Sequence, residues 1–289
     1  MVKYVVGVDL GGTNIKAGLV RNGKILSKVS IKTQANKGEK AVINNIIKAI
    51  NSVKTNKVKA VGIGSPGPLN YKTGVILKTP NLPFRNTHLK TILQKRLKLK
   101  VKIDNDAKCF VLSEALYGAG KGYNTVVGLT LGTGVGGGIV INKKIFHGRL
   151  NAGEYGHATI NFDGYKSRCG NNGCLETYVS ARGILRKAGL KGIRIKSPLE
   201  LYESANRGNK KAIETFEEIG FYLGVGVTNI ILSFDPDVVV LGGDISNSWK
   251  FFSKTMKSTI KQRSILKGTN VVKSKMKNGA IIGAASLVS

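Results

Sequence analysis

The chain has 289 residues, which is long enough for two modest domains with hydrophobic cores. It carries 46 Lys and Arg against 16 Asp and Glu, and this net charge of +30 favours polyanions. However, the basic residues are spread along the whole chain and form no recognition helix, so no specific nucleic-acid partner is expected. No apolar run could cross a membrane, and three cysteines argue against a disulfide framework and for a cytoplasmic protein.

The first half of the chain predicts three consecutive strands followed by alternating helices and strands. The strands are expected at Lys3–Asp9, Asn14–Val20, Ile25–Lys32, Val58–Gly64 and Val101–Asp104. One helix is expected at Glu39–Ser52, where apolar residues recur on one face, a short one from about Asn86, and a third through Leu116.

The second half repeats this theme and then departs from it. Strands are expected at Val126–Leu131, Val135–Ile141, near Lys144–Phe146, at Asp237–Gly243 and at Thr269–Lys273. Helices are expected at about Pro198–Arg207, Lys210–Leu232, Trp249–Arg263 and Gly279–Val288, and His147–Glu176 reads as an irregular, glycine-rich insertion. This alternation predicts an α/β protein.

Two matching stretches, Val5–Thr13 and Val126–Gly134, each join an apolar strand to a glycine-rich turn. Both read Val-Val-Gly, an aliphatic residue, a variable residue and Leu-Gly. Glycines here let backbone N–H groups approach an anion closely, so the pair predicts a phosphate site in a duplicated domain. The alternative is two ordinary hairpins. The variable residue is Asp9 in the first copy, and a carboxylate beside phosphates indicates Mg²⁺ between them. Lys16 is either near the phosphates or solvated.

Asp104-Asn105-Asp106 lies where a predicted strand gives way to a helix. A carboxylate there can act as the general base that accepts a hydroxyl proton during phosphoryl transfer. The alternative is a helix N-cap that satisfies free backbone amides. Both hold if Asn105 caps the helix and Asp106 faces a cleft.

Cys169 and Cys174, with His157 nearby, offer three ligands for a structural zinc ion, although no fourth ligand is evident. Two buried thiols and a satisfied histidine are the alternative. Glu154 and Glu176 flank this cluster and could accept hydrogen bonds from sugar hydroxyls, unless they are ordinary surface residues. The residues left without a role are His88, His147 and Cys109, the last being a small core residue.

Several motifs in order along the chain resemble the sugar kinases of the ROK family (repressor, open reading frame, kinase), and glucokinases above all. They are DLGGTNIKAGLV at Asp9–Val20, GSPGP at Gly64–Pro68, PNLP at Pro80–Pro83, NDA at Asn105–Ala107, LGTGVGGGIV at Leu131–Val140, GEYGH at Gly153–His157, CGNNGCLETYVS at Cys169–Ser180 and LGGDIS at Leu241–Ser246. Together they cover nearly the whole chain.

The resemblance implies an actin-like ATPase fold, with two ribonuclease-H-like domains around a central cleft. We expect one domain at residues 1–107 plus about 277–289, and a larger one at 108–276 that carries the insertion at about 147–176. It further implies a homodimer that takes ATP, Mg²⁺ and a hexose as ligands.

The resemblance also assigns roles to individual residues. Asp106 would deprotonate the C6 hydroxyl of the sugar. The sugar would be bound by Gly67, Asn81, Asn105, Asp106, Glu154, His157 and Glu176. ATP with Mg²⁺ would lie against Asp9, Gly11, Gly12, Thr13, Asn14, Lys16, Gly132, Thr133 and Gly134, with the adenosine near Gly242 and Gly243.

One position departs from the family pattern. The zinc loop of the family usually reads Cys-x-Cys-Gly-x-x-Gly-Cys, and the first cysteine is replaced here by Ser167. Serine is a poor zinc ligand, so His157, Cys169 and Cys174 would share the metal with water or another group.

Several alternatives stay open at this stage. The acceptor could be N-acetylglucosamine, N-acetylmannosamine, fructose, mannose or allose in place of glucose, and the donor could be inorganic polyphosphate. The family also contains DNA-binding repressors that sense sugars, but those carry a helix-turn-helix ahead of the first kinase strand, and here that strand begins at once. A basic nucleic-acid scaffold would need neither Asp106 nor the paired glycine turns.

Overall fold

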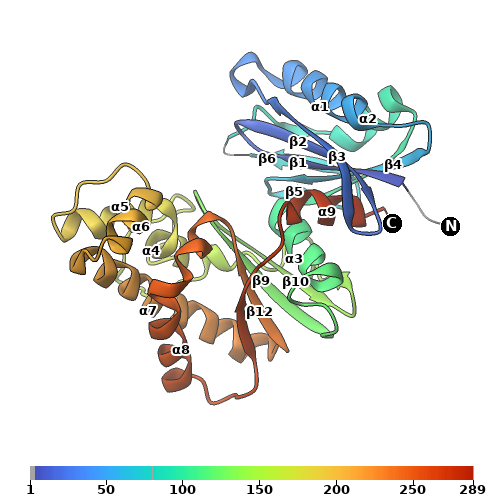
Figure 1. The fold of residues 1–289 in the computed structure, drawn as a ribbon. Coiled ribbons are helices and arrows are strands. Elements are labelled where there is room, and N and C mark those ends of the chain that lie inside the picture. The colour runs from blue at the N-terminus through green and yellow to red at the C-terminus, as the bar shows by residue number, and fades with distance from the viewer. Residues whose placement is uncertain (1–3, 80, 289) are drawn as a thin grey trace. The chain divides into compact units, whose positions relative to one another are not determined.

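The computed structural model describes residues 4–79 and 81–288, and these divide into two units (Figure 1). Unit 1 comprises the described residues through Gly122, Gly138–Ala152, and the described residues from Met276 onward. Unit 2 comprises Tyr123–Gly137 and Gly153–Lys275. Pro80, part of the PNLP motif, lies outside the described residues. The described helices include none long and apolar enough to cross a membrane.

Unit 1 contains the first eight strands, the helices α1, α2 and α3 among and after them, the short strand β11 and the C-terminal helix α9. Its elements are β1 (Tyr4–Leu10), β2 (Asn14–Arg21), β3 (Lys24–Lys32), η1 (Ala35–Lys37), α1 (Glu39–Val53), β4 (Val58–Ser65), β5 (Leu69–Asn70), β6 (Val75–Lys78), β7 (Arg85–Thr87), α2 (Leu89–Leu97), β8 (Lys100–Asn105), α3 (Asp106–Tyr117), β11 (Lys144–Ile145) and α9 (Gly279–Ser286). The strand β10 (Val135–Ile141) begins in unit 2 and ends in unit 1.

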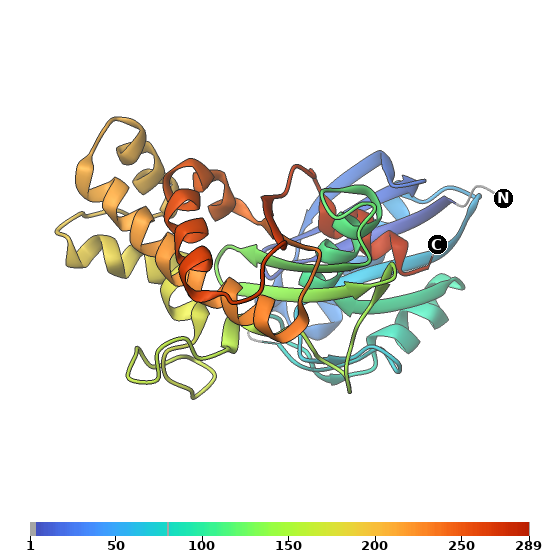
Figure 2. The same cartoon turned by 90° about the horizontal axis from the view of Figure 1, so that it is seen from below.

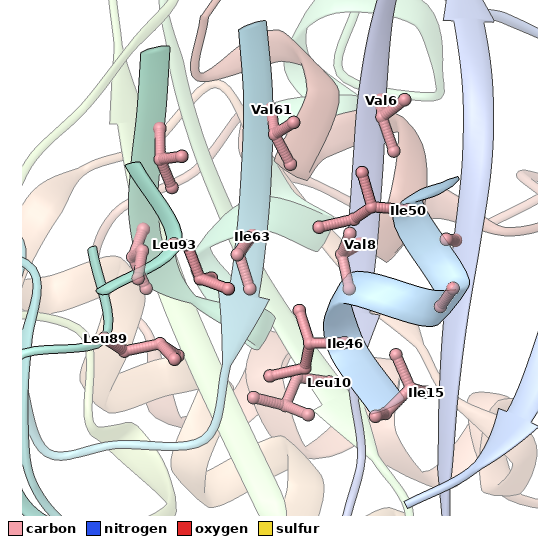
Figure 3. Close-up of a cluster of buried hydrophobic side chains, with 14 of the residues drawn as sticks. Val6, Val8, Leu10, Ile15, Ile46, Ile50, Val61, Ile63, Leu89 and Leu93 are labelled. Carbon is pink, nitrogen blue, oxygen red and sulfur yellow. The ribbon is translucent and has the colours of Figure 1, made fainter. Parts of the chain in front are cut away.

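The main core of unit 1 lies between its five-stranded sheet and two helices (Figure 3). The sheet has the order β3-β2-β1-β4-β8. On one face, Val8 of β1 and Ile63 of β4 are fully buried beneath Ile46 of α1 and Leu93 of α2. The apolar spacing in α1 therefore faces the sheet, as the sequence predicts.

The opposite face of this sheet is covered by α9, the red helix among the blue strands in Figures 1 and 2. Two glycines of the sheet allow α9 to pack directly against the strands β1 and β4. A β-carbon at Gly7 would stand 2.0 Å from the carbonyl oxygen of Ile281, and one at Gly62 only 1.7 Å from that of Ala284. Because both faces of β1 and β4 are covered, these strands read as continuous apolar runs.

Unit 2 is built from three parallel strands and a group of helices. Its elements are β9 (Thr125–Leu131), η2 (Tyr155–His157), α4 (Leu175–Val179), α5 (Ala181–Leu190), α6 (Pro198–Asn206), α7 (Lys210–Phe234), β12 (Val238–Gly242), η3 (Asp244–Ser248), α8 (Trp249–Arg263) and β13 (Asn270–Lys273). The long helix α7 packs closely on α8, because Gly220 and Gly224 leave room for Phe252 and Thr259.

The two large sheets share one strand order, which confirms the predicted repetition. The second sheet reads β11-β10-β9-β12-β13, matching β3-β2-β1-β4-β8 element by element. In each sheet, the strand that feeds a glycine turn is central and has a parallel partner, β4 beside β1 and β12 beside β9.

Several short elements were not predicted from the sequence. The region from Leu69 to Thr87 forms a three-stranded sheet, β5-β6-β7, and Asn86 belongs to β7 whereas the helix α2 starts only at Leu89. The helices α4 and α5 were also missed, because five residues are too few to display a helical period and α5 carries two glycines.

Candidate functional site

Three neighbouring strands of unit 1 bring functional residues to one edge of its sheet. Asp9 of β1 is in register with Gly64 of β4, and Gly64 is in register with Asp104 of β8. The three strands are parallel, so their carboxyl ends meet, and this edge is where α/β proteins bind ligands.

Asp106 is the first residue of α3 and follows directly from the end of β8. Asn105 is the N-cap of this helix, and its side-chain oxygen accepts the backbone N–H of Lys108 at 3.1 Å. The capping alternative therefore holds for Asn105. Asp106 is half-buried, and its Oδ1 accepts the adjacent N–H of Ala107 at 2.9 Å. The N-cap of α3 is therefore Asn105 and not Asp106.

Glycines bring the β4 strand and the loop after it close to these two residues. A β-carbon at Gly64 would lie 3.3 Å from Cα of Asp106, and one at Gly67 would lie 3.6 Å from Nδ2 of Asn105. The GSPGP and NDA motifs, far apart in the sequence, therefore meet in unit 1.

The first glycine turn connects β1 to β2 and is anchored by Thr33. The N–H of Gly11 donates to the carbonyl oxygen of Asn14 at 3.0 Å, which closes the turn. The Thr33 hydroxyl donates to the carbonyl oxygen of Gly11 at 2.6 Å, and its N–H donates to that of Thr13 at 2.9 Å. The carbonyl oxygens of Gly11, Thr13 and Asn14 all accept hydrogen bonds, and these bonds fix the conformation of the turn.

Asp9 and Asn81 both lie beside this turn. A β-carbon at Gly12 would stand 2.9 Å from Cβ of Asn81, so the PNLP loop packs directly on the turn. Asp9 is opposite Lys16 in the β1–β2 register. Burial raises the pKa of the Asp9 carboxyl above its usual value, and the charge of Lys16 partly offsets this shift. A carboxylate oxygen at this position fits the hard oxygen ligation that Mg²⁺ requires.

Two residues near this edge were not found from the sequence. His147 has no role in the sequence interpretation, yet its Nε2 lies 2.7 Å from Oδ2 of buried Asp104, and its ring stacks on Tyr71 at 3.5 Å. Lys108 is only 1% exposed, and its Nζ donates to the carbonyl oxygen of Leu150 at 3.2 Å. Neither partner is near in sequence, so no local pattern indicates these contacts.

The second glycine turn, in unit 2, is held by the side chain of Glu176. One carboxylate oxygen of Glu176 accepts the N–H of Val135 at 2.9 Å, and a β-carbon at Gly134 would stand 2.6 Å from it. The N–H of Ala181 donates to the carbonyl oxygen of Gly132 at 2.9 Å. Glu176 is therefore no ordinary surface glutamate, because it fixes the turn.

The end of β12 lies against the same turn. Gly242 is in register with Thr130 of β9, and a β-carbon at Gly243 would stand 2.3 Å from the carbonyl oxygen of Leu131. Gly243 has a φ of 82°, which favours glycine. The two glycine motifs of unit 2 are thus brought together.

A small cavity of about 90 Å³ opens beside this turn and carries several positive charges. Thr133 and Glu176 line it, together with Lys166, Arg168, Arg182 and Arg186. No sequence pattern indicates these basic residues, because they come from a loop and from α5 and meet only in the fold. They make this part of unit 2 suitable for an anionic ligand.

His157, Cys169 and Cys174 gather in one cluster of unit 2, with their ligand atoms all within 4.8 Å of one another. The two sulfurs lie 3.6 Å apart. Two sulfurs on a tetrahedral zinc ion lie about 3.8 Å apart, so the spacing fits zinc. The Ser167 hydroxyl lies 3.4 Å from Sγ of Cys169, in place of the cysteine that the family pattern has.

The cysteine cluster also positions the predicted sugar-binding glutamates. Cys174 is the N-cap residue of α4, the helix that carries Glu176 in its first turn. Glu154 is exposed and precedes η2, and its carbonyl oxygen accepts the N–H of His157 at 3.0 Å. The N–H of Leu175 donates to the carbonyl oxygen of Ala158 at 2.9 Å, which ties η2 to α4.

The predicted residues therefore fall into two sets. Unit 1 holds Asp9, Gly11, Gly12, Thr13, Asn14, Lys16, Gly67, Asn81, Asn105 and Asp106. Unit 2 holds Gly132, Thr133, Gly134, Glu154, His157, Cys169, Cys174, Glu176, Gly242 and Gly243. A family profile described as "ROK family" matches residues 5–289.

The chain belongs to the ROK family. The glucokinase of Thermotoga maritima is 35% identical to it over 306 residues, which covers 98% of this chain and 96% of that protein. The N-acetyl-D-glucosamine kinase of Haemophilus influenzae is 35% identical over 257 residues, which covers 83% of this chain and 84% of that protein. The ROK assignment from the sequence motifs is thus confirmed.

Solved structures of ROK proteins share the fold. The ROK family glucokinase of Streptomyces griseus, crystallised with glucose and AMPPNP, matches with a TM-score of 0.84 at 30% identity, and 98% of each chain is covered. This match confirms the actin-like α/β fold that the sequence predicts.

Proposed function

We propose that this ROK protein is an ATP-dependent kinase that phosphorylates the 6-hydroxyl of a hexose, with glucose as the first candidate. The position of Asp106 carries this proposal. Asp106 is half-buried in the first turn of α3, directly after the N-cap residue Asn105, and it lies at the same sheet edge as Asp9 and the first glycine turn. The ROK relatives named above, which include a glucokinase, support the same activity.

In the proposed reaction, the Asp106 carboxylate accepts the proton of the sugar 6-hydroxyl as that oxygen attacks the γ-phosphorus of ATP. A new P–O bond forms to the sugar. The bond between the γ-phosphorus and the bridging oxygen breaks, and its electron pair leaves with ADP.

Backbone amides of both glycine turns would bind the phosphates, and Asp9 would hold Mg²⁺ through its carboxylate. Bound Mg²⁺ would neutralise charge on the phosphate oxygens. Burial raises the pKa of the Asp9 carboxyl above its usual value, and a bound cation would favour the charged form of this group. Gly242 and Gly243 would lie beside the adenosine.

Sugar recognition would use Gly67, Asn81 and Asn105 from unit 1, and Glu154, His157 and Glu176 from unit 2. His157 would also hold zinc with Cys169 and Cys174, and water or another group would complete the shell. The sulfur–sulfur distance of 3.6 Å supports this metal, and zinc would hold the loop that leads into α4 and Glu176.

Two observations support alternative substrates. The N-acetyl-D-glucosamine kinase of Haemophilus influenzae is also 35% identical, over 83% of this chain against 98% for the glucokinase, which keeps N-acetylated hexosamines among the acceptors. The basic residues of the cavity beside Thr133 would attract phosphate groups, which keeps inorganic polyphosphate among the donors.

The proposal is tested by a coupled assay with the purified protein and Mg²⁺. The acceptors are glucose, mannose, fructose, allose, N-acetylglucosamine and N-acetylmannosamine, each with ATP or polyphosphate as the donor. We expect the highest kcat/KM with glucose and ATP, and ³¹P-coupled NMR should place the phosphate on C6. Absence of turnover with every combination of acceptor and donor would exclude the kinase assignment. If an N-acetylated sugar gave the highest kcat/KM, that sugar would replace glucose as the proposed substrate.

A further inference from the structure

Unit 1 contains a second cavity, of about 460 Å³, that the proposed phosphoryl transfer does not use. Five lysines line it: Lys72, Lys90, Lys102, Lys143 and Lys144. They come from the β5–β6 turn, α2, β8 and the β10–β11 hairpin, in which Lys143 lies in the turn and Lys144 begins β11. The volume is in the range of small-molecule binding sites, and we call this feature the lysine cavity.

The positive charge of the lysine cavity is not balanced by its own walls. Asp104 supplies the one carboxylate among the described lining residues, and both of its oxygens are engaged, Oδ1 by the N–H of Asn105 and Oδ2 by His147. Among the ion pairs of residues 4–79 and 81–288, none includes any of the five lysines. Like charges in a concave surface focus a positive potential that attracts anions.

Lys143 is held at this cavity in an unfavourable backbone conformation. Asn142 and Lys143 form the β10–β11 turn with φ angles of 51° and 64°. The corresponding turn between β2 and β3 is Asn22-Gly23, with φ angles of 49° and 74°. Glycine adopts this conformation without steric cost and lysine does not. A residue that keeps such strain is a candidate for function.

Ring and hydrogen-bond contacts join several residues that line the lysine cavity. The rings of Tyr71 and His147 stack with their centroids 3.5 Å apart and their planes 6° from parallel, and His147 is also bonded to Asp104. The ammonium of Lys90 donates to the carbonyl oxygen of Lys72 at 3.0 Å, which joins two of the lysine-bearing segments. The cavity is thus partly organised before any ligand binds.

We propose that the lysine cavity binds a small polyanion with two or more phosphoryl groups. Lysine ammonium groups bind phosphate oxygens as point charges, and five of them match a ligand with several negative charges. Inorganic tripolyphosphate and a bisphosphorylated sugar share this chemistry, and the experiment below distinguishes them.

The test measures binding of each probe, tripolyphosphate and fructose 1,6-bisphosphate, by isothermal titration calorimetry on the full chain. Glucose and a non-hydrolysable ATP analogue are present in excess, so that the glycine turns are occupied. We expect one molecule of probe per chain, and the probe with the lower Kd identifies the ligand class. Failure of the ATP analogue to bind would contradict the proposed kinase function but not the lysine cavity, because variants of the cavity lysines locate the probe independently.

Two double variants separate a built site from general attraction to a basic protein. Lys143→Ala with Lys144→Ala should weaken binding about tenfold or more, because two ammonium groups are lost. Lys24→Ala with Lys28→Ala removes the same charge from exposed lysines of β3 and should change Kd by less than about twofold. Equal weakening in both, or no binding of either probe, would overturn the proposal.

Lys143→Gly provides a variant that should keep the fold, because glycine is suited to the backbone conformation of residue 143. Glycine suits the φ of 64°, so the melting temperature should rise while binding of the probe weakens several-fold. A variant that is more stable and binds as tightly as the unaltered protein would show that Lys143 does not contact the ligand.

Discussion

Glu176 accepts a hydrogen bond from the backbone N–H of Val135 at 2.9 Å, so one side chain of α4 fixes the second glycine turn. Glu176 is also proposed to bind the sugar. We therefore expect Glu176→Ala to raise KM for both ATP and sugar, each by about tenfold or more, since a charged hydrogen bond contributes about 1.5–3 kcal/mol. Glu176→Gln keeps an acceptor oxygen and should affect ATP less. Steady-state kinetics measures both, and an unchanged KM for ATP in the alanine variant would contradict the anchoring role.

Asp106→Asn should lower kcat by about 10²- to 10⁴-fold, because general-base catalysis contributes that much. Binding of the sugar, measured by calorimetry, should largely survive, since asparagine keeps the shape and a hydrogen-bonding side chain. Asp235→Asn is the control, because Asp235 is exposed and its left-handed backbone also suits asparagine. Near-normal turnover in Asp106→Asn would remove Asp106 as the base.

Gly132→Ala tests whether the ATP phosphates approach the backbone of the second glycine turn, without altering the stability of the protein. A β-carbon at Gly132 would meet no other described atom within 4 Å, so the variant should fold with unchanged stability. If ATP phosphates approach this backbone, the methyl group should raise the KM for ATP about tenfold, which corresponds to about 1.4 kcal/mol. A normal KM for ATP would place the phosphates elsewhere.

Gly62→Ala should destabilise the protein by about 3 kcal/mol or more, because its β-carbon would stand 1.7 Å from the carbonyl oxygen of Ala284 on α9. Gly189→Ala is the matched control. Gly189 lies in α5 with open space around it, so alanine should raise stability there by about 0.5–1 kcal/mol. Urea unfolding measures both, and equal effects would mean that α9 does not pack on the sheet through Gly62.

Cys169 should be the reactive thiol of the zinc-free protein. A hydrogen bond from Ser167 stabilises the thiolate and lowers the pKa of Cys169 to about 7, and the side chain is exposed. Alkylation by iodoacetamide should therefore accelerate as the pH rises through about 7, since the thiolate forms above that pKa. Ser167→Ala should move this midpoint upward, and bound zinc should protect the thiol.

Buried Cys109 is the internal control for that experiment. Burial raises its pKa well above the ordinary value, so it should stay unmodified throughout this pH range. Mass spectrometry identifies the modified residue. Equal alkylation of Cys109 and Cys169, or no protection of Cys169 by zinc, would contradict the proposed cluster.

Much of the fold could be predicted from the sequence because its strongest signals are local. The apolar runs of β1, β4, β9 and β12 mark strands with both faces covered, and the spacing in α1 and α7 marks helices. The β5–β7 sheet and α4 could not be predicted, since two to five residues carry no measurable period. Domain boundaries stay a prediction, as do the homodimer and the individual ligand contacts.

The family, the paired glycine turns and the candidate base Asp106 could be identified from the amino-acid sequence alone, because each depends on residues adjacent in the chain. Only the tertiary structure decided that Asp104 pairs with His147, that Glu176 anchors Val135, and that lysines from four segments share one cavity. Those relationships join residues dozens of positions apart. Strand register and helix packing set their distances, and no local pattern encodes either one.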